Sequence, residues 1–201
     1  VLPLKIKKPK WFDGTGLVVG SFVPDLKWFL TLLFKDLPIR SLHSIGDTIY
    51  MVPFSLVLVV ILDKVLFPTA SFLASKNRLS LISNCLSYFG VDEWHLQRNK
   101  ELSVKWFVKT SSSIIIGVLS HFMLDLPTHG QITYLQPFYT AEMPAWFLIE
   151  YSKLNLPLLG EWEVTNYNLL WLLFSFMFAL LALYQLRYIK KHKLLIKWQQ
   201  L

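Results

Sequence analysis

The sequence has 201 residues, of which 54% are hydrophobic and 15% aromatic, whereas only 16% are charged. Soluble domains carry roughly a quarter charged residues, so these proportions exclude a disordered chain and argue against an ordinary soluble protein. The mean hydropathy of +0.44 indicates an integral membrane protein instead. Because Cys85 is the single cysteine, the sequence excludes an intramolecular disulfide and a thiolate metal cluster.

Four apolar stretches predict an all-α, polytopic membrane protein with about four transmembrane helices. They cover residues 16–34, 48–67, 111–126 and 164–186. A helix needs about 20 apolar residues to cross a bilayer, and the last stretch contains no charged residue at all. The stretch from Met143 to Gly160 is apolar but interrupted by charged residues and a proline. We interpret it as a re-entrant or interfacial segment, with a fifth span as the alternative.

The net charge of +7 arises from basic residues that flank these stretches, as orientation signals do, so we attribute it to topology and not to nucleic-acid binding. Residues 1–201 form one membrane domain, with a basic linker at about 68–109 and a basic tail at about 187–201. We expect the linker and both termini to lie in the cytoplasm. The spacing of Leu79, Ile82, Leu86 and Phe89 predicts an amphipathic helix on the membrane surface, where anionic lipid head groups are the expected partners.

Ionisable residues inside apolar stretches mark the candidate site, because each costs at least ~3 kcal/mol at the bilayer centre. His121 and Asp125 are four residues apart and therefore share one helical face, as two ligands of a divalent metal would. Further ligands must come from elsewhere in the chain, and Asp25, His43 and His129 are the candidates. In the four-span topology Asp25 lies deeper than the others, unless Pro24 breaks the first helix.

Several short motifs recur in the same order in a known family. They are Leu-Pro at 2–3, Gly-Ser-Phe-Val-Pro-Asp at 20–25, His-Ser at 43–44, Ser-His-Phe-Met-Leu-Asp at 120–125 and Thr-His at 128–129. The sequence thus resembles a domain-of-unknown-function family of bacterial multi-span inner-membrane proteins, related to membrane-bound proteins classed as metal-dependent hydrolases. The resemblance implies that Asp25, His43, His121 and Asp125 are metal ligands, with His129 as the next candidate. It also implies a Ser-His-Pro segment ahead of the Leu-Pro motif, whose histidine would be a further ligand.

Together these features predict a membrane-embedded hydrolase of a lipid-linked or membrane-proximal ester, favouring a phosphoester. A divalent metal would activate water, and Asp25 or Asp125 would accept its proton. Zinc suits this ligand set, and manganese and iron remain alternatives. Two other classes stay open: an ion or proton transporter that uses the intramembrane His and Asp as a relay, and a membrane scaffold in which they are polar packing.

Overall fold

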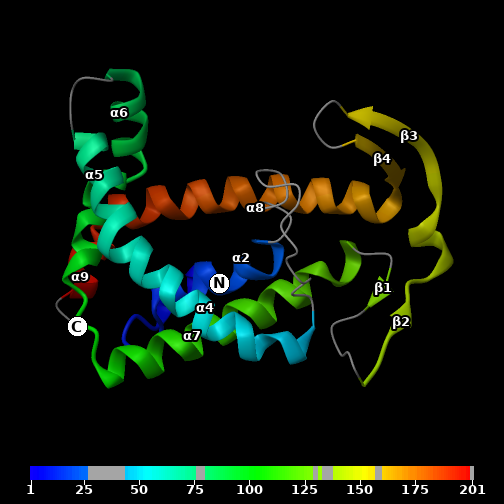
Figure 1. The fold of residues 1–201 in the computed structure, drawn as a ribbon. Coiled ribbons are helices and arrows are strands. Elements are labelled where there is room, and N and C mark those ends of the chain that lie inside the picture. Colours follow the sequence, from blue (N-terminus) through cyan, green and yellow to red (C-terminus); the bar gives the residue numbers. More distant parts are fainter. Residues whose placement is uncertain (27–43, 76–79, 129–130, 133–137, 157–159, 200–201) are drawn as a thin grey trace.

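The computed structural model describes residues 1–26, 44–75, 80–128, 131–132, 138–156 and 160–199, and the molecule is mostly helical (Figure 1). The helices are α1 (Leu2–Lys7), α2 (Gly14–Phe22), α4 (Thr48–Ile61), α5 (Phe67–Ser75), α6 (Ser80–Tyr88), α7 (Val104–Asp125), α8 (Asn166–Lys191) and α9 (Leu194–Gln199). Shorter turns are η1 (Val23–Asp25), η2 (Ile45–Asp47), η3 (Leu62–Leu66), η5 (Val91–Asn99), η6 (Leu126–Thr128) and η7 (Ala145–Leu148). The strands are β1 (Gln131–Ile132), β2 (Ala141–Glu142), β3 (Glu150–Leu156) and β4 (Gly160–Thr165).

Three helical segments are long and apolar enough to cross a membrane. They are Ile45–Ser75, Val104–Thr128 and Asn166–Lys191. They contain the second and third predicted spans and all of the fourth except its first two residues, which belong to β4. In the first predicted span, 16–34, the α-helix ends at Phe22 and is followed by the 3-10 turn η1, where Pro24 lies. Residues 27–34 lie outside the described part of the chain.

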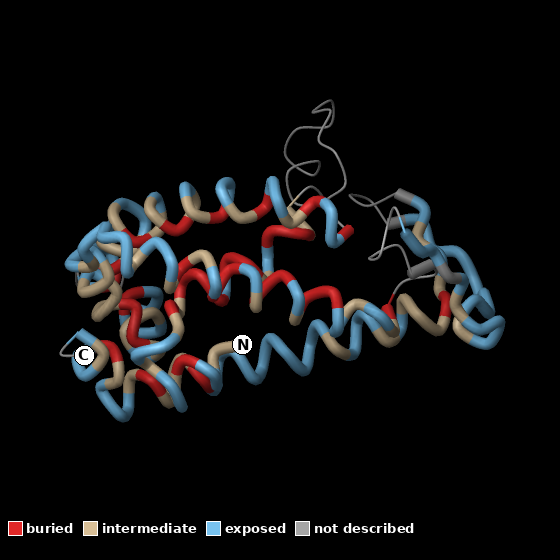
Figure 2. The backbone as a smooth tube through the Cα atoms, turned by 90° about the horizontal axis from the view of Figure 1, so that it is seen from below, coloured by how far each residue is buried: buried red, intermediate tan, exposed pale blue. Residues whose placement is uncertain are grey.

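The core lies where α2, α4 and α7 face one another. Its fully buried side chains include Val23 from η1, Met51 and Val59 from α4, and Ile114 and Val118 from α7. Figure 2 shows buried residues gathered along these helices, whereas α8 is exposed over most of its length. An apolar helix whose side chains remain exposed in this way is suited to lipid contact.

Glycines bring α2 and α7 into backbone contact. A Cβ on Gly20 would overlap the carbonyl oxygen of Ile114, and a Cβ on Gly117 would lie 2.5 Å from the carbonyl oxygen of Leu17. Gly16 precedes Gly20 by one helical turn and faces Thr110 and Ser113. Small residues four apart permit this close approach of helices in membranes, where van der Waals packing drives association.

A π-helical turn interrupts the second long segment at η3. It precedes Pro68, which has no N–H to give to the carbonyl four residues earlier, so a regular α-helix cannot continue unchanged through this point. The turn carries Asp63, whose side chain is almost fully buried. The carboxylate of Asp63 therefore faces the interior of the bundle and not its exposed surface.

The predicted linker is not one surface element. Within 68–109 the chain completes α5, forms α6 and η5, and begins α7. In α6 the hydroxyl of Ser83 donates to the carbonyl of Ala74, while Leu81 and Ile82 are exposed. This arrangement suits a helix at a membrane surface, which remains a prediction.

Two antiparallel strand pairs add to the predicted all-α fold. β1 pairs with β2, and β3 pairs with β4 in a hairpin that joins Glu150 to Thr165. Part of the stretch 143–160 is therefore extended strand, and the alternative of a fifth helical span there is wrong. Its apolar composition was misleading because a strand, whose side chains alternate between two faces, can be as apolar as a helix. Its charged residue Lys153 lies opposite Glu163 on β4 and forms an ion pair with it.

We expect Gly20→Ala to destabilise the protein by about 1–3 kcal/mol, because the new Cβ meets the backbone of α7 and not a movable side chain. Thermal unfolding in detergent measures the effect. Gly14→Ala, in the same helix, is the matched control: its Cβ would have ordinary contact, 3.5 Å from Lys5 Cγ. Equal stability of the two variants would contradict the importance of the close crossing.

Candidate metal centre

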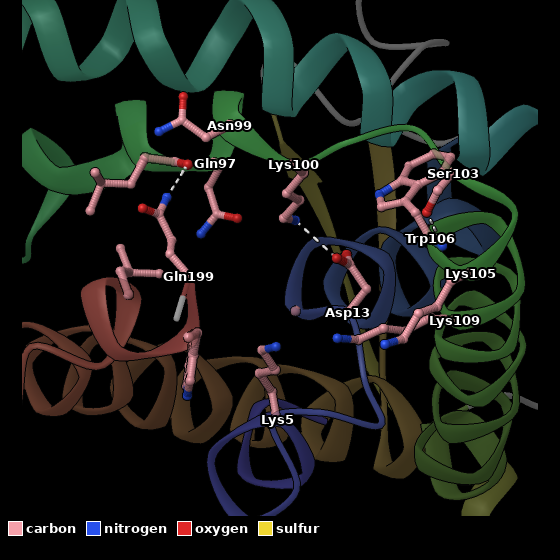
Figure 3. A pocket seen from close by; sticks show the side chains of 14 residues that line it. Lys5, Asp13, Gln97, Asn99, Lys100, Ser103, Lys105, Trp106, Lys109 and Gln199 are labelled. Carbon is pink, nitrogen blue, oxygen red and sulfur yellow. Dashed lines mark hydrogen bonds and ion pairs between the residues drawn. The ribbon is translucent and has the colours of Figure 1, made fainter. Parts of the chain in front are cut away.

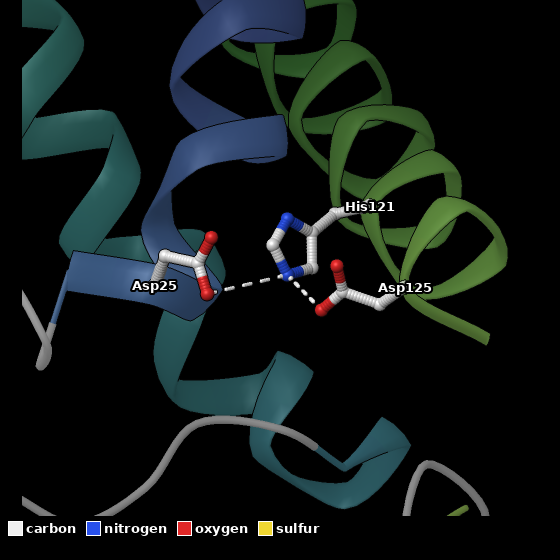
Figure 4. Close-up of side chains that lie close together, drawn as sticks. All are labelled: Asp25, His121 and Asp125. Carbon is white, nitrogen blue, oxygen red and sulfur yellow. Dashed lines mark ion pairs between the residues drawn. The ribbon is translucent and has the colours of Figure 1, made fainter. Parts of the chain in front are cut away.

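Three of the predicted ligands converge from two elements. Asp25 lies on η1, and His121 and Asp125 lie on the last turn of α7, facing it (Figure 4). His121 Nε2 is 2.8 Å from Asp125 Oδ2 and 3.7 Å from Asp25 Oδ1. One ligand atom from each of the three residues lies within 4.8 Å of the others. No second group of three such ligands occurs among the described residues.

The close crossing of α2 and α7 explains this convergence. The two helices are parallel where their glycines touch, so the residues that follow Gly20 lie beside the residues that follow Gly117. Ending the α-helix at Phe22 turns Asp25 toward α7. The depth difference predicted between Asp25 and Asp125 is therefore absent, because Pro24 lies in a 3-10 turn and not in a continuous helix.

The imidazole of His121 is oriented by a backbone contact. Its Nδ1 lies 3.0 Å from the carbonyl oxygen of Ser21, which can only accept a hydrogen bond, so Nδ1 carries the proton. In the neutral ring Nε2 then presents a lone pair toward Asp25 and Asp125. Such a backbone contact on the far nitrogen is the arrangement that fixes histidine ligands of metals.

The three side chains differ in access. The side chains of His121 and Asp125 are 8% and 13% exposed, whereas that of Asp25 is 41% exposed. A cavity of about 350 Å³ adjoins all three, and α8 supplies one of its walls. That wall is largely apolar, with Trp171, Phe174, Phe178 and Leu181. A polar end and an apolar wall thus share one cavity.

The other two predicted ligands, His43 and His129, lie outside the described residues. Three of the five therefore have a position in the structure. The sequence assigns no functional role to His95 and His192. Both side chains are exposed and belong to other segments than Asp25, His121 and Asp125. His95 contacts the carbonyl of Asp92 and the hydroxyl of Ser71, and the ring of His192 packs at a tilt against that of Tyr188.

Comparison with known proteins gives a family but no function. Residues 1–159 match the family model described as "Domain of unknown function (DUF4184)". The chain belongs to this family. The matched region contains Asp25, His121 and Asp125, and it ends before β4 and α8. No curated protein and no solved structure matches the chain.

The DUF4184 chain has a second buried polar group that the sequence analysis missed. Lys100 Nζ lies 2.9 Å from Asp13 Oδ2 and 2.8 Å from Asp63 Oδ2, and Thr15 donates a hydrogen bond of 2.8 Å to Asp63. Asp13 also caps α2 by accepting a hydrogen bond from Gly16 N. The sequence contained one signal, since Asp followed by Gly-Thr-Gly is typical of a helix start. Nothing in the sequence linked it to Lys100.

Charge pairing sets the protonation of this group. Burial favours the neutral form of Lys100, but the charges of Asp13 and Asp63 outweigh it and raise the pKa of the lysine. Burial likewise opposes the charge on Asp13, yet Lys100 and the Gly16 N–H lower the pKa of that carboxyl below its usual value. Lys100 and Asp13 are therefore charged near neutral pH, and the group links α2, η3 and the segment ahead of α7.

We expect Lys100→Met to destabilise the protein by about 3–5 kcal/mol, since it leaves two buried carboxylates without their cation. Chemical unfolding measures this loss. Lys105→Met, at an exposed neighbouring lysine, should change stability by less than about 0.5 kcal/mol. Adding Asp13→Asn and Asp63→Asn to Lys100→Met should restore much of the stability; a further loss would show that the ion pairs are not the cause.

Proposed function

We propose that this protein is a membrane-embedded, metal-dependent hydrolase whose centre contains Asp25, His121 and Asp125. The observation that carries the proposal is the convergence of one imidazole nitrogen and two carboxylates within 4.8 Å. The proposed substrate is a lipid-linked or membrane-proximal phosphoester. The proposed location is a bacterial inner membrane.

The donor set suits a divalent cation. His121 Nε2 and Asp125 Oδ2 lie 2.8 Å apart, the distance of a hydrogen bond, so a proton on Nε2 can bridge the two atoms. Asp25 adds a second negative charge on the same side. A divalent cation can take the place of the proton between His121 and Asp125, with Nε2 and the carboxylate oxygens as its ligands. Zinc is the first choice for one histidine and two carboxylates, and manganese or iron is the alternative.

Three protein ligands leave coordination positions for water and substrate, as in catalytic metal sites. When bound, the metal supplies the Lewis acidity that hydrolysis needs. Asp25 is the residue best placed to accept a proton, because its carboxylate is the most exposed of the three and faces the cavity. Asp125 remains beside His121 and holds the ring against the Ser21 carbonyl.

The neighbouring cavity supports a lipid-linked substrate. A phosphoester placed against the polar end would leave its hydrocarbon portion beside the aromatic and leucine side chains of α8. These residues contribute apolar area without further charge, which is what an acyl or prenyl chain requires.

Metal analysis of the full-length, detergent-purified protein tests the site. We expect about one metal ion per chain, lost in His121→Ala and retained in His192→Ala, which removes an exposed histidine at the end of α8. Asp25→Asn should lower hydrolysis of p-nitrophenyl phosphate by about 10²–10⁴-fold, in the range of a lost proton acceptor. Glu163→Gln, on the hairpin, is the carboxylate control.

Well-folded protein without metal would contradict the proposal. The imidazole between two carboxylates would then favour the proton relay. Proton flux in proteoliposomes that is lost in Asp25→Asn would identify that function.

The proposed orientation places Lys5, the linker and the tail in the cytoplasm. Contacts gather them at one end of the molecule: Lys190 pairs with Asp92 and Glu93, and Lys5 lies over the ring of Trp198. Cys85 is exposed on α6 at this end and is a natural probe. In intact cells it should resist a membrane-impermeant maleimide, whereas Glu161→Cys in a Cys85→Ser background should react. Labelling of Cys85 from outside would reverse the orientation.

A further inference from the structure

A second cavity, of about 380 Å³, lies at the other end of the α2–α7 pair from the candidate metal centre. Four lysines line it: Lys5 from α1, Lys100 ahead of α7, and Lys105 and Lys109 from α7 (Figure 3). Their side chains extend toward the space beside Asp13. The candidate metal centre contains none of these residues, so this cavity is independent of the proposed function.

Two of the ammonium groups are forced close together. Lys5 Nζ donates a hydrogen bond of 2.7 Å to the carbonyl oxygen of Pro9, and Lys109 Nζ donates one of 3.3 Å to the same oxygen. Lys5 is only 8% exposed. Two positively charged ammonium groups thus donate to one neutral carbonyl oxygen in a largely buried position.

Carboxylates balance only part of this charge. Lys100 is paired with Asp13 and Asp63, but Lys5, Lys105 and Lys109 form no ion pair within the described part of the chain. The four lysines and two aspartates together leave two positive charges uncompensated. Burial, followed by the charge of Lys109, lowers the pKa of Lys5 to about 8, although nearby Asp13 opposes this effect. An anion in the cavity would relieve the repulsion.

The remaining lining supplies what a phosphate group needs. Ser103 caps α7, and it lines the cavity together with Gln97 and Asn99. The start of the 22-residue helix α7 adds the positive end of a helix dipole. Trp106 and Trp198 flank the cavity, as aromatic rings do at the level of lipid head groups.

We propose that this cavity binds a phosphate group through Lys5, Lys105 and Lys109, with Lys100 held in place by Asp13 and Asp63. The phosphate belongs either to an anionic lipid head group or to a soluble phosphate compound. Lysine ammonium groups act as point charges toward phosphate and need no fixed planar geometry. Asp13 also lines the cavity, where it pairs with Lys100.

Thermal unfolding of the full chain tests the site with two probes. The first is inorganic phosphate in detergent, with sodium chloride of equal ionic strength as its control. The second is nanodiscs of phosphatidylcholine with or without phosphatidylglycerol. A ligand that binds the folded state raises the unfolding temperature. Stabilisation by both probes, or by either one alone, supports the site, and the pattern identifies a lipid-linked or a soluble source.

Matched double variants locate the effect. Lys5→Gln with Lys109→Gln should weaken phosphate binding about tenfold or more, because hydrogen bonds to charged groups are lost. Lys7→Gln with Lys8→Gln removes the same charge from exposed positions outside the cavity and should leave binding unchanged. Lys105→Gln alters only an exposed cavity lysine and should lose part of the effect without affecting folding.

Three results would overturn the proposal. The first is no stabilisation of the wild type by either probe. The second is an equal effect of sodium chloride. The third is an equal loss in the two double variants, which would indicate general charge attraction and not a site.

Discussion

The backbone contact between α2 and α7 at Gly20 and Gly117 is the constraint on which the rest of the structure depends. Because two helices can approach this closely only where side chains are absent, these positions fix how the residues beyond them meet. Ahead of the crossing, the N–H of Asp13 donates to the hydroxyl of Ser113. Beyond it, the carbonyl of Ser21 contacts His121. The same crossing thus orders a polar group at each end.

The two ends carry opposite chemistry. At one end, Asp25 and Asp125 gather negative charge around a single imidazole. At the other, lysines outnumber the aspartates that they contact. Fully buried apolar side chains such as Leu17, Ile114 and Val118 separate the groups, so their fields act over different surfaces. This charge distribution is the basis for proposing a cation at the first end and a phosphate at the second.

Sequence patterns predicted features that depend on local spacing. Three apolar stretches lie in helices long enough to cross a membrane, and the i, i+4 spacing placed His121 beside Asp125. Features that depend on distant contacts were not predictable. The strand pairing of β3 with β4 requires a partner that composition does not reveal. The contact of Lys100 with Asp63 joins residues 37 positions apart through a π-helical turn that no periodicity indicated.

The measurement that tests the account most directly is cobalt(II) binding, followed by visible absorption, to wild-type protein and to Gly20→Ala. This substitution removes no ligand, but it pushes η1 and Asp25 away from α7. The account predicts weaker cobalt binding in Gly20→Ala and a smaller effect in Gly16→Ala, whose Cβ would meet Thr110 O at 3.1 Å. Unchanged affinity in a folded Gly20→Ala protein would contradict the claim that this crossing assembles the candidate metal centre.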